Sequence, residues 1–366
     1  MLALADAGLT SYPFGVVPPI GPTSVWADRR QFRAQLEELV ASWRNKPTSG
    51  IYLLWADFGA GKTHALRYIE GIAASTVPPS VAVYAELPEA AADFKEVYQQ
   101  IVFAISEDAL TRAIFAFRQK YRDQWLAAPI LKGDRDTPRA MWMLAQEGSD
   151  VQAEAARKWM RAERLYAREL AQIDYLTPIR TAQQAVKTLS TICRIMLEPG
   201  DIARVVLMLD EFQRIGQVSR RRIADINSGI RTLYNSCPTG LAIVLSYSFG
   251  VRENIRFLVT PEVQTCVERE YALPALTRED ANTFILDLLK ASSIDGEGRN
   301  AFTSAGVKQG IDLLVKDVGT HLTPRKVMQA FTVVLDGALQ DGVARFPLSS
   351  PAVAGLYRTP APDPQA

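Results

Sequence analysis

The sequence predicts an α/β protein in which helices flank a parallel β-sheet, with a long helical insertion and a helical domain after the sheet. Short continuous apolar runs, typical of parallel strands buried on both faces, alternate with helical segments. Residues 90–200 have helical periodicity and separate the second run from the third. Because an ordinary crossover connection needs far fewer residues, part of this stretch must be an insertion, which we place at about 108–175.

The expected elements follow one another in the order that such a sheet requires. The expected strands are residues 51–56, 81–87, 205–210 and 241–248, with a shorter fifth run at 271–273. The first helix of the later domain has an N-terminal signature, because Thr277 is placed to cap it and Asp280 follows three residues on. Further helices are expected over residues 305–316 and 324–339.

Composition and charge limit the kinds of function. The chain has 366 residues, of which 48% are hydrophobic and 22% charged, and its formal net charge is +1. Because the protein has no overall basic field, any nucleic-acid surface must be local. No apolar run approaches the roughly 20 residues that cross a bilayer, and the N-terminus lacks the pattern of a signal peptide. We expect a cytoplasmic protein with no membrane partner.

Cysteine and histidine residues suggest neither a metal site nor a disulfide framework. Cys193, Cys237 and Cys266 lie far apart in the sequence, as do His64 and His321. No pair has the spacing of metal ligands, and the cysteines do not form the pattern of a disulfide scaffold. This usage suits a reducing compartment.

A glycine-rich turn follows the first expected strand in the segment WADFGAGKTHAL, residues 55–66. Between a buried strand and a helix, such a turn presents backbone N–H groups and the positive end of the helix to an anion. Lys62 is placed for the β- and γ-phosphates of a nucleotide, and Thr63 for Mg²⁺. The residues expected to hold the nucleotide are Ala56, Gly59, Ala60, Gly61, Lys62, Thr63 and His64.

The match to the phosphate-loop pattern has one departure, since the pattern begins with glycine and this chain has Ala56 there. The alternative is a glycine turn that carries a surface lysine. The strand and helix on either side of the turn disfavour that alternative. We therefore predict a phosphate-binding loop.

Two adjacent acidic residues end the third expected strand, in the segment VVLMLDEF. Asp210 can hold Mg²⁺ through its water shell, and Glu211 can orient and deprotonate the attacking water. Two acids at a strand end are common by themselves, but with an upstream phosphate loop they predict ATP hydrolysis. GTP is disfavoured because the sequence has no N-K-x-D motif, and a kinase would need a second substrate site that we do not find.

Together these segments resemble an AAA+ ATPase over roughly residues 13–339, apart from the insertion. The resemblance rests on ADFGAGKT, on LMLDEF, on a polar residue near the end of the strand AIVLSYS, and on an arginine in LTPRKVMQAF. It implies that Ser246, or else Ser248 on the same side of the strand, helps to position the hydrolytic water. It also implies that Arg325 senses the γ-phosphate, the alternative being an exposed arginine at a helix start.

Within this family the chain is most similar to initiator-type, transposon target-selection and bacterial defence ATPases. The TPR form of the sensor arginine and the long gap before Asp210 favour these groups over unfoldases, whose aromatic-glycine pore loop is missing from the sequence. The segment YPFGVVPP resembles the arm that packs against adenine in origin-recognition ATPases. An arginine finger is expected shortly before the fifth strand, where Arg269 is the nearest candidate, with Arg252 and Arg256 before it.

Two functions remain open for the ATP cycle. In the first, the chain is a switch that oligomerises on duplex DNA through backbone contacts and recruits or licenses an effector protein, such as a nuclease or transposase. Arg220, Arg221 and Arg222 are the candidate DNA contacts, because adjacent arginines can contact phosphates without reading sequence. In the second, the chain is the ATPase subunit of a defence-type complex, which docks an effector through its insertion and binds no DNA.

We expect four segments along the chain. Residues 1–46 form an N-terminal arm and a first helix, 47–275 the nucleotide-binding core, and 276–345 a helical lid domain. Residues 346–366 are rich in proline and have little to pack, so we expect them to be disordered.

Overall fold

The computed structural model describes residues 2–15, 26–27, 29–146, 150–248, 252–296, 300–341 and 345–358. The chain divides into two compact units. The first consists of Met1–Glu38, Ala56–Tyr68 and Ala272–Ala366, and the second of Leu39–Trp55 and Ile69–Tyr271. This division differs from the expected boundaries, because the glycine-rich loop and most of the N-terminal segment belong to the same unit as the C-terminal helices.

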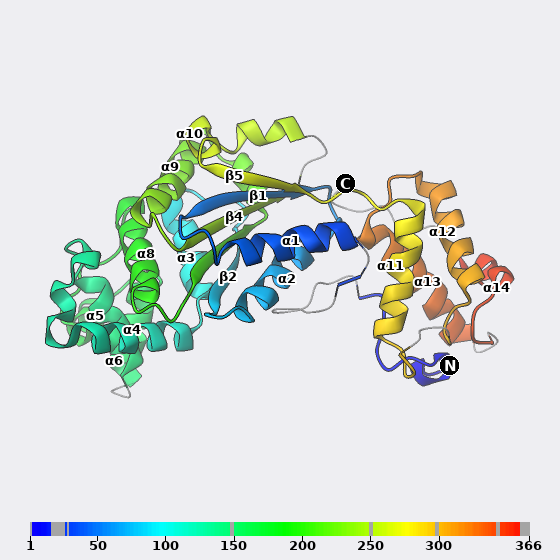
Figure 1. The fold of residues 1–366 in the computed structure, drawn as a ribbon, viewed down its shortest axis with the longest axis horizontal. Helices are drawn as coiled ribbons and strands as arrows, with labels where there is room; N and C mark the ends of the chain where they lie inside the picture. Colours follow the sequence, from blue (N-terminus) through cyan, green and yellow to red (C-terminus); the bar gives the residue numbers. More distant parts are fainter. Residues whose placement is uncertain are drawn as a thin grey trace. The chain divides into compact units, whose positions relative to one another are not determined.

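A five-stranded β-sheet forms the centre of the second unit (Figure 1). Its strands, in the spatial order β2-β3-β4-β1-β5, are β1 (Gly50–Ala56), β2 (Ser80–Glu86), β3 (Arg204–Asp210), β4 (Leu241–Ser248) and β5 (Val267–Ala272). β2 pairs with β3 and β3 with β4 in parallel, and the register sets Glu86 opposite Asp210. The carboxyl ends of these strands therefore lie at one edge of the sheet, which confirms the predicted parallel arrangement.

The burial of the strands explains which of them the sequence predicted well. β3 and β4 are buried along their whole length, as their continuous apolar sequences indicated. β5 lies at an edge of the sheet and spans Val267–Ala272 instead of 271–273, and Tyr271 is its one fully buried residue. Because the edge strand VEREYA is mostly exposed and charged, a search for continuous apolar runs misplaced it.

Helices pack against the sheet and against one another in the second unit. They are α3 (Phe94–Ala104), α8 (Ala182–Leu197) and α9 (Arg220–Ser236). Two more helices, α1 (Arg30–Ser42) and α2 (Lys62–Ala74), begin in the first unit and end in the second. α3, α8 and α9 contact one another, while α3 also contacts β2 and α8 contacts β3. The Asp93 side chain accepts hydrogen bonds from the first turn of α3, and Thr181 caps α8, so both helix starts are fixed by their own sequence.

Further helices between β2 and β3 form the predicted insertion. They are α4 (Glu107–Tyr121), α5 (Asp136–Ala145), α6 (Asp150–Met160) and α7 (Ala167–Gln172), with short 3₁₀ turns at Arg122–Ala127 and Pro129–Leu131. Figure 1 shows α4, α5 and α6 grouped beside α8, and α4 and α5 contact that helix. Inside the group, the Arg118 guanidinium lies 4.9 Å from the ring centroid of Trp125 and 3.5 Å from that of Trp142. The indoles thus pack around a cation within the insertion.

The first unit has its own helical core. It contains α11 (Arg278–Ala291), α12 (Ser304–Val318), α13 (Pro324–Asp341) and α14 (Ser350–Leu356), with a 3₁₀ turn at Leu4–Ala7. Thr277 caps α11 and forms a capping box with Asp280, as predicted. Phe14 is buried in this core, with its ring 6.1 Å from Phe302 and 5.7 Å from Phe331. Phe14 therefore packs in the helical core of the first unit. The adenine contact that the resemblance implied stays a prediction, and residues 16–25 lie outside the described residues.

The expectation of disorder over residues 346–366 is wrong for the part that the structure describes. α14 occupies Ser350–Leu356, and both Leu348 and Val353 are fully buried. The backbone N–H groups of Thr303 and Leu348 donate to Leu348 O and Ala301 O, which fixes this segment beside the start of α12. The apolar residues spaced along this proline-rich stretch are sufficient to pack it. Residues 359–366 lie outside the described residues.

No helix in the described ranges is both long enough and apolar enough to cross a membrane.

Arg204 at the start of β3 is a buried cation that joins neighbouring segments of the second unit. Its side chain is almost fully buried, and its guanidinium donates to the carbonyl oxygens of Thr48 at 3.1 Å, of Leu241 at 3.3 Å and of Lys46. The same group lies 5.8 Å from the Trp43 ring centroid. Burial lowers the pKa of this guanidinium. Arg204 therefore ties the segment before β1 to β3 and β4.

Replacing Arg204 with alanine is expected to lower the free energy of unfolding by about 3 kcal/mol, because it leaves a cavity and buried carbonyl groups without donors. Urea denaturation measures this change. Arg44→Ala, at an exposed position, is the matched control and is expected to change stability by no more than about 0.5 kcal/mol. Equal stability of the two variants would contradict a stabilising role for Arg204.

Candidate functional site

The glycine-rich loop connects the end of β1 at Ala56 to the start of α2 at Lys62. Gly59 and Gly61 have φ angles of +72° and +96°, a left-handed region that glycine adopts without strain. A loop of this kind before a helix N-terminus can present backbone N–H groups to an anion. The Lys62 side chain is 5% exposed, and its Nζ donates to Asp57 O at 3.3 Å, so the loop itself holds this ammonium group.

The start of α13 lies against this loop, within the same unit. The backbone N–H of Arg325 donates to Gly59 O at 3.2 Å, and His321 Nε2 lies 2.6 Å from Asp57 Oδ2. A Cβ atom at Gly59 would stand 2.9 Å from the Cβ of Arg325, so the close approach also requires glycine. The structure therefore places Arg325 beside the phosphate loop. His321, to which the sequence assigned no role, contributes a second contact.

Two residues before α1 also contact the loop region, and no sequence motif indicated either of them. Arg29 donates to Ala60 O and to Pro274 O, both at 2.6 Å. The Trp26 ring lies 5.7 Å from the His64 ring and 4.8 Å from the Tyr68 ring. Arg29 thus supports the loop backbone. Trp26 packs against α2, the helix that follows the loop.

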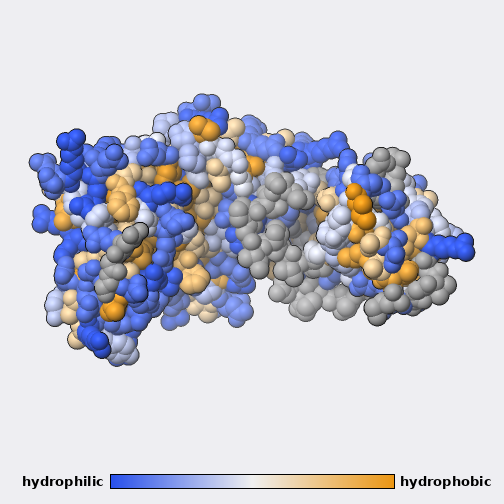
Figure 2. Space-filling model, turned by 90° about the horizontal axis from the view of Figure 1, so that it is seen from below, coloured by the Kyte–Doolittle hydropathy of each residue, from blue (hydrophilic) through white to orange (hydrophobic). Residues whose placement is uncertain are grey.

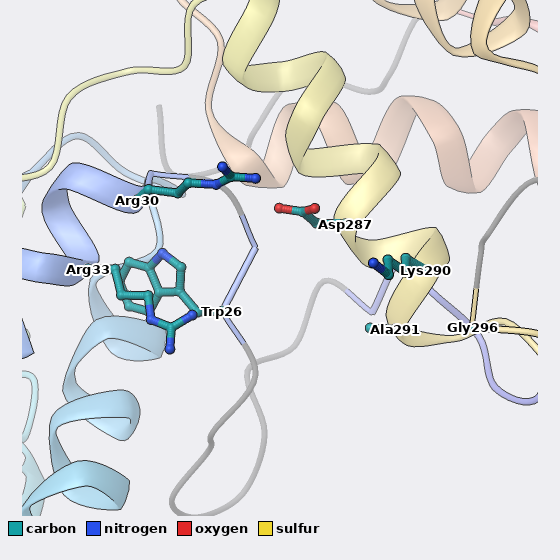
Figure 3. Close-up of a pocket in the computed structure, with 7 residues that line it drawn as sticks. All are labelled: Trp26, Arg30, Arg33, Asp287, Lys290, Ala291 and Gly296. Atoms are coloured by element: carbon teal, nitrogen blue, oxygen red, sulfur yellow. The ribbon is translucent and has the colours of Figure 1, made fainter.

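A cavity of about 470 Å³ opens beside Trp26. Its lining residues are Trp26, Arg30, Arg33, Asp287, Lys290, Ala291 and Gly296. Figure 3 shows Arg30 and Asp287 projecting toward the same gap from α1 and α11, with Trp26 at its edge. Glu37 balances the charge of Arg33, since the Arg33 Nε lies 2.9 Å from Glu37 Oε1. The cavity is polar, and the remaining lysine and arginine give it an excess of positive charge.

In the second unit, Asp210 is fully buried at the end of β3 and is held by several donors. Its Oδ2 accepts from the Tyr84 hydroxyl at 2.9 Å, and its Oδ1 accepts from the Ser246 hydroxyl at 2.8 Å and from the Glu211 N–H at 2.9 Å. Donors of this kind fix the direction of a carboxylate, as the surroundings of a metal ligand do. The sequence did not indicate Tyr84, because its contact depends on the pairing of β2 with β3.

The predicted water-positioning serine has a different contact from the one expected. The Ser246 hydroxyl is engaged by the Asp210 carboxylate, whereas Ser248 is the last residue of β4. Ser248 is 1% exposed, and its Oγ has no hydrogen-bond partner among the residues that the structure describes. Ser246 therefore orients the aspartate, and the choice between the two serines as the water-positioning residue stays a prediction.

Glu211 follows β3 with a φ angle of +57°, which ends the strand and starts a 3₁₀ turn at Phe212–Gln217. Gln213 Nε2 donates to Glu211 Oε2 at 2.6 Å. The other end of the same amide, Gln213 Oε1, accepts from the backbone N–H of Ser248 at 2.9 Å. One side chain thereby links the glutamate to the end of β4.

Arg214 joins the same region to the end of β2. Its Nη2 lies 2.8 Å from Glu86 Oε1, and its Nη1 donates to Leu87 O at 2.6 Å. Its Nε lies 4.0 Å from Glu211 Oε2, at the limit of an ion pair. A cation and an amide donor therefore face the same oxygen of Glu211. Neither Gln213 nor Arg214 belongs to a motif, and the sequence analysis missed both.

Comparison with known proteins decides the family. A protein-family profile described as an AAA domain matches residues 45–253, more than half of the chain. The chain belongs to this AAA family. The matched region of the AAA+ chain contains the phosphate loop, the acidic end of β3 and the whole insertion. The predicted membership of the AAA+ family is therefore confirmed. No curated protein sequence matches the AAA+ chain.

Solved structures match this AAA+ chain at low sequence identity. The ORC2 protein of Aeropyrum pernix, in ADPNP–ADP complexes, is 15% identical with a TM-score of 0.55, and the match covers 91% of this chain and 70% of that one. Cdc6p of Pyrobaculum aerophilum is 13% identical with a TM-score of 0.49, over 90% and 66% of the two chains. Aeropyrum pernix ORC1 in complex with DNA is 15% identical with a TM-score of 0.49, over 94% and 68%. The match to ORC2 shows a common fold.

The candidate arginine finger of the AAA+ chain does not lie where it was expected. Arg269 is inside β5, exposed at the edge of the sheet, with its guanidinium 5.4 Å from the Tyr271 ring centroid. The expectation placed it before the strand, and it failed because the start of β5 was misplaced. Arg256, in the 3₁₀ turn Arg252–Phe257, is exposed and does precede β5.

Arg220, Arg221 and Arg222 are the first three residues of α9 in the AAA+ chain, and all three are exposed. The first turn of this helix contains no acidic residue, and the Ser219 side chain makes no capping hydrogen bond. The N-terminal end of a helix dipole is positive, and the three arginines add to it. Positive charge is therefore concentrated at this turn. The arginines are therefore better placed to attract an anion than to stabilise the helix.

Proposed function

We propose that this AAA+ chain binds ATP with Mg²⁺ and hydrolyses the γ-phosphate. One observation carries the proposal: the buried Asp210 carboxylate is oriented by three donors, directly before Glu211 at the end of β3. Lys62 and the backbone of the phosphate loop would hold the phosphates, and Glu211 would take a proton from the attacking water. Release of phosphate from ATP by the wild-type chain tests this function.

The residues present fit Mg²⁺ as the metal. Its preferred ligands are oxygen atoms and ordered water. The Asp210 carboxylate would hold such water, and the phosphate-loop motif predicts the Thr63 hydroxyl as a ligand. Mg²⁺ would neutralise negative charge on the phosphate oxygens. Tyr84 and Ser246 keep the Asp210 oxygens in place for it. No cluster of His, Cys, Asp and Glu typical of another metal site occurs among the described residues.

We further infer that the ATP state assembles as an oligomer on duplex DNA and recruits an effector protein. The support for DNA is the charge at the start of α9, where Arg220–Arg222 and the helix N-terminus face solvent together. Such a turn suits phosphate groups and has no base-specific element, because arginines that contact phosphates position a protein without reading sequence. The fold shared with ORC2 is compatible with this function.

Replacing Arg220, Arg221 and Arg222 with alanine is expected to weaken ATP-dependent DNA binding and to reduce the slope of log K against log salt by roughly 2 to 3, because fewer counterions are released. Fluorescence anisotropy over a salt series measures both quantities. The matched control is alanine at Arg161, Arg164 and Arg168, which removes equal charge from the insertion. If both triple variants change binding equally, the start of α9 is not the DNA contact.

The alternative function, docking of an effector without DNA, has an observation of its own. Apolar side chains are exposed on and beside the insertion: Phe103 at 68%, Phe115 at 48%, Tyr166 at 62% and Tyr175 at 72%. Figure 2 shows apolar patches among charged residues on the end of the molecule that carries the insertion helices. Exposed aromatic side chains are frequent anchors of protein interfaces. This alternative predicts that DNA has no effect on assembly.

A further inference from the structure

We propose that Gln213 is the positioning residue for Glu211, a role that rests on the proposed hydrolysis of ATP. Gln213 holds the glutamate and the end of β4 at the same time. Its Nε2 donates to Glu211 Oε2 at 2.6 Å, and its Oε1 accepts from the Ser248 N–H at 2.9 Å. The two partners fix the direction of the amide, since a carboxylate can only accept and a backbone N–H can only donate.

Glu211 needs such support because the regular strand ends before it. The β2–β3 register ends with Glu86 opposite Asp210, and Glu211 has the left-handed φ of +57°. A glutamate side chain can adopt several rotamers, and a carboxylate displaced by about 1 Å from its working position can lose roughly 100-fold in rate. The Gln213 donor, with Arg214 facing the same oxygen, favours one of these rotamers.

Gln213 itself lies in a turn that is packed into the core. It lies in the 3₁₀ turn Phe212–Gln217, in which Phe212 and Ile215 are fully buried in the core of the second unit. The Ser248 backbone that it also contacts is the last residue of β4, a strand buried along its whole length. Gln213 thereby connects Glu211 to a buried turn and to the end of β4.

Gln213→Met keeps the length of the side chain and removes both hydrogen bonds. We expect kcat for ATP to fall by about 10- to 100-fold, while KM and the melting temperature stay unchanged, because positioning of the base acts on the chemical step alone. Gln217→Met, at an exposed position of the same turn, is the matched control and is expected to keep wild-type kcat. A Gln213→Met enzyme with unchanged or increased kcat would overturn the proposal.

Gln213→Glu distinguishes the two hydrogen bonds. Its carboxylate can still accept from the Ser248 N–H, but it cannot donate to Glu211 and places a like charge beside it. We expect the same loss of kcat as for Gln213→Met. Wild-type kcat in Gln213→Glu would mean that the contact with Glu211 has no role, which also overturns the proposal.

A double-mutant cycle separates positioning from a merely structural effect. In the Glu211→Gln background the base is gone, so Gln213→Met is expected to cause no further loss in single-turnover rate. Multiplication of the two losses would show that Gln213 acts independently of Glu211. Failure of the underlying function is distinguishable, because wild-type protein would then release no phosphate from ATP at all.

Discussion

Replacement of Glu211 by glutamine is expected to lower kcat for ATP by at least about 100-fold and to leave ATP binding intact, because a general base contributes roughly 10²- to 10⁴-fold. The amide cannot take a proton from water, yet it has the size of the carboxylate and can still accept the hydrogen bond from Gln213. The fold and the phosphate loop should therefore be unaffected. Phosphate release and calorimetric titration with ATP and Mg²⁺ measure the two properties.

Glu89→Gln is the matched control for this change. Glu89 is an exposed residue shortly after β2, so its substitution removes one carboxylate with little effect on packing. We expect its turnover to equal that of the wild type. Normal turnover in Glu211→Gln would show that another residue is the base.

Lys62→Ala is expected to weaken ATP binding by about 100-fold, which corresponds to about 3 kcal/mol and is the scale of charge-assisted hydrogen bonds to phosphate. Lys62 is the first residue of α2, and its side chain is 5% exposed within the loop. The ammonium group therefore needs little reorganisation to meet the β- and γ-phosphates. Titration with ATP and Mg²⁺ measures the dissociation constant.

The control for Lys62 is another lysine in the first turn of a helix. Lys95 follows Phe94 at the start of α3, and its replacement by alanine removes the same charge from a comparable position. ATP should bind to Lys95→Ala as to the wild type. An unchanged dissociation constant in Lys62→Ala would mean that the glycine turn is not a phosphate site.

The central strands could be predicted closely because their signals are local. The expected strands 51–56, 205–210 and 241–248 correspond to Gly50–Ala56, Arg204–Asp210 and Leu241–Ser248. Strands buried on both faces must be apolar throughout, and that pattern is visible in one dimension. β5 was misplaced and α14 was missed because an edge strand and a short packed helix depend on neighbours that are remote in the sequence.

The candidate site likewise contains residues that the sequence indicated and residues that it did not. Lys62, Thr63, Asp210 and Glu211 stand in short motifs, so their spacing alone indicated them. The residues that support the motifs do so through contacts between distant segments. These contacts are Tyr84 with Asp210, Gln213 with Ser248, Arg29 with Ala60 and Arg325 with Gly59. Such contacts follow from strand pairing and helix packing, which one sequence does not display. Arg325 was named through the resemblance to a known family, and its role as a γ-phosphate sensor stays a prediction.

The mass in solution of the Glu211→Gln protein with ATP and Mg²⁺, measured by light scattering with and without duplex DNA, tests the proposed switch most directly. Lys62→Ala serves as the control that cannot hold ATP. We predict a larger assembly only when ATP and DNA are both present, and none with Lys62→Ala. A protein that stays monomeric, or that assembles with ATP alone and is indifferent to DNA, would contradict the DNA switch and favour docking of an effector on the insertion.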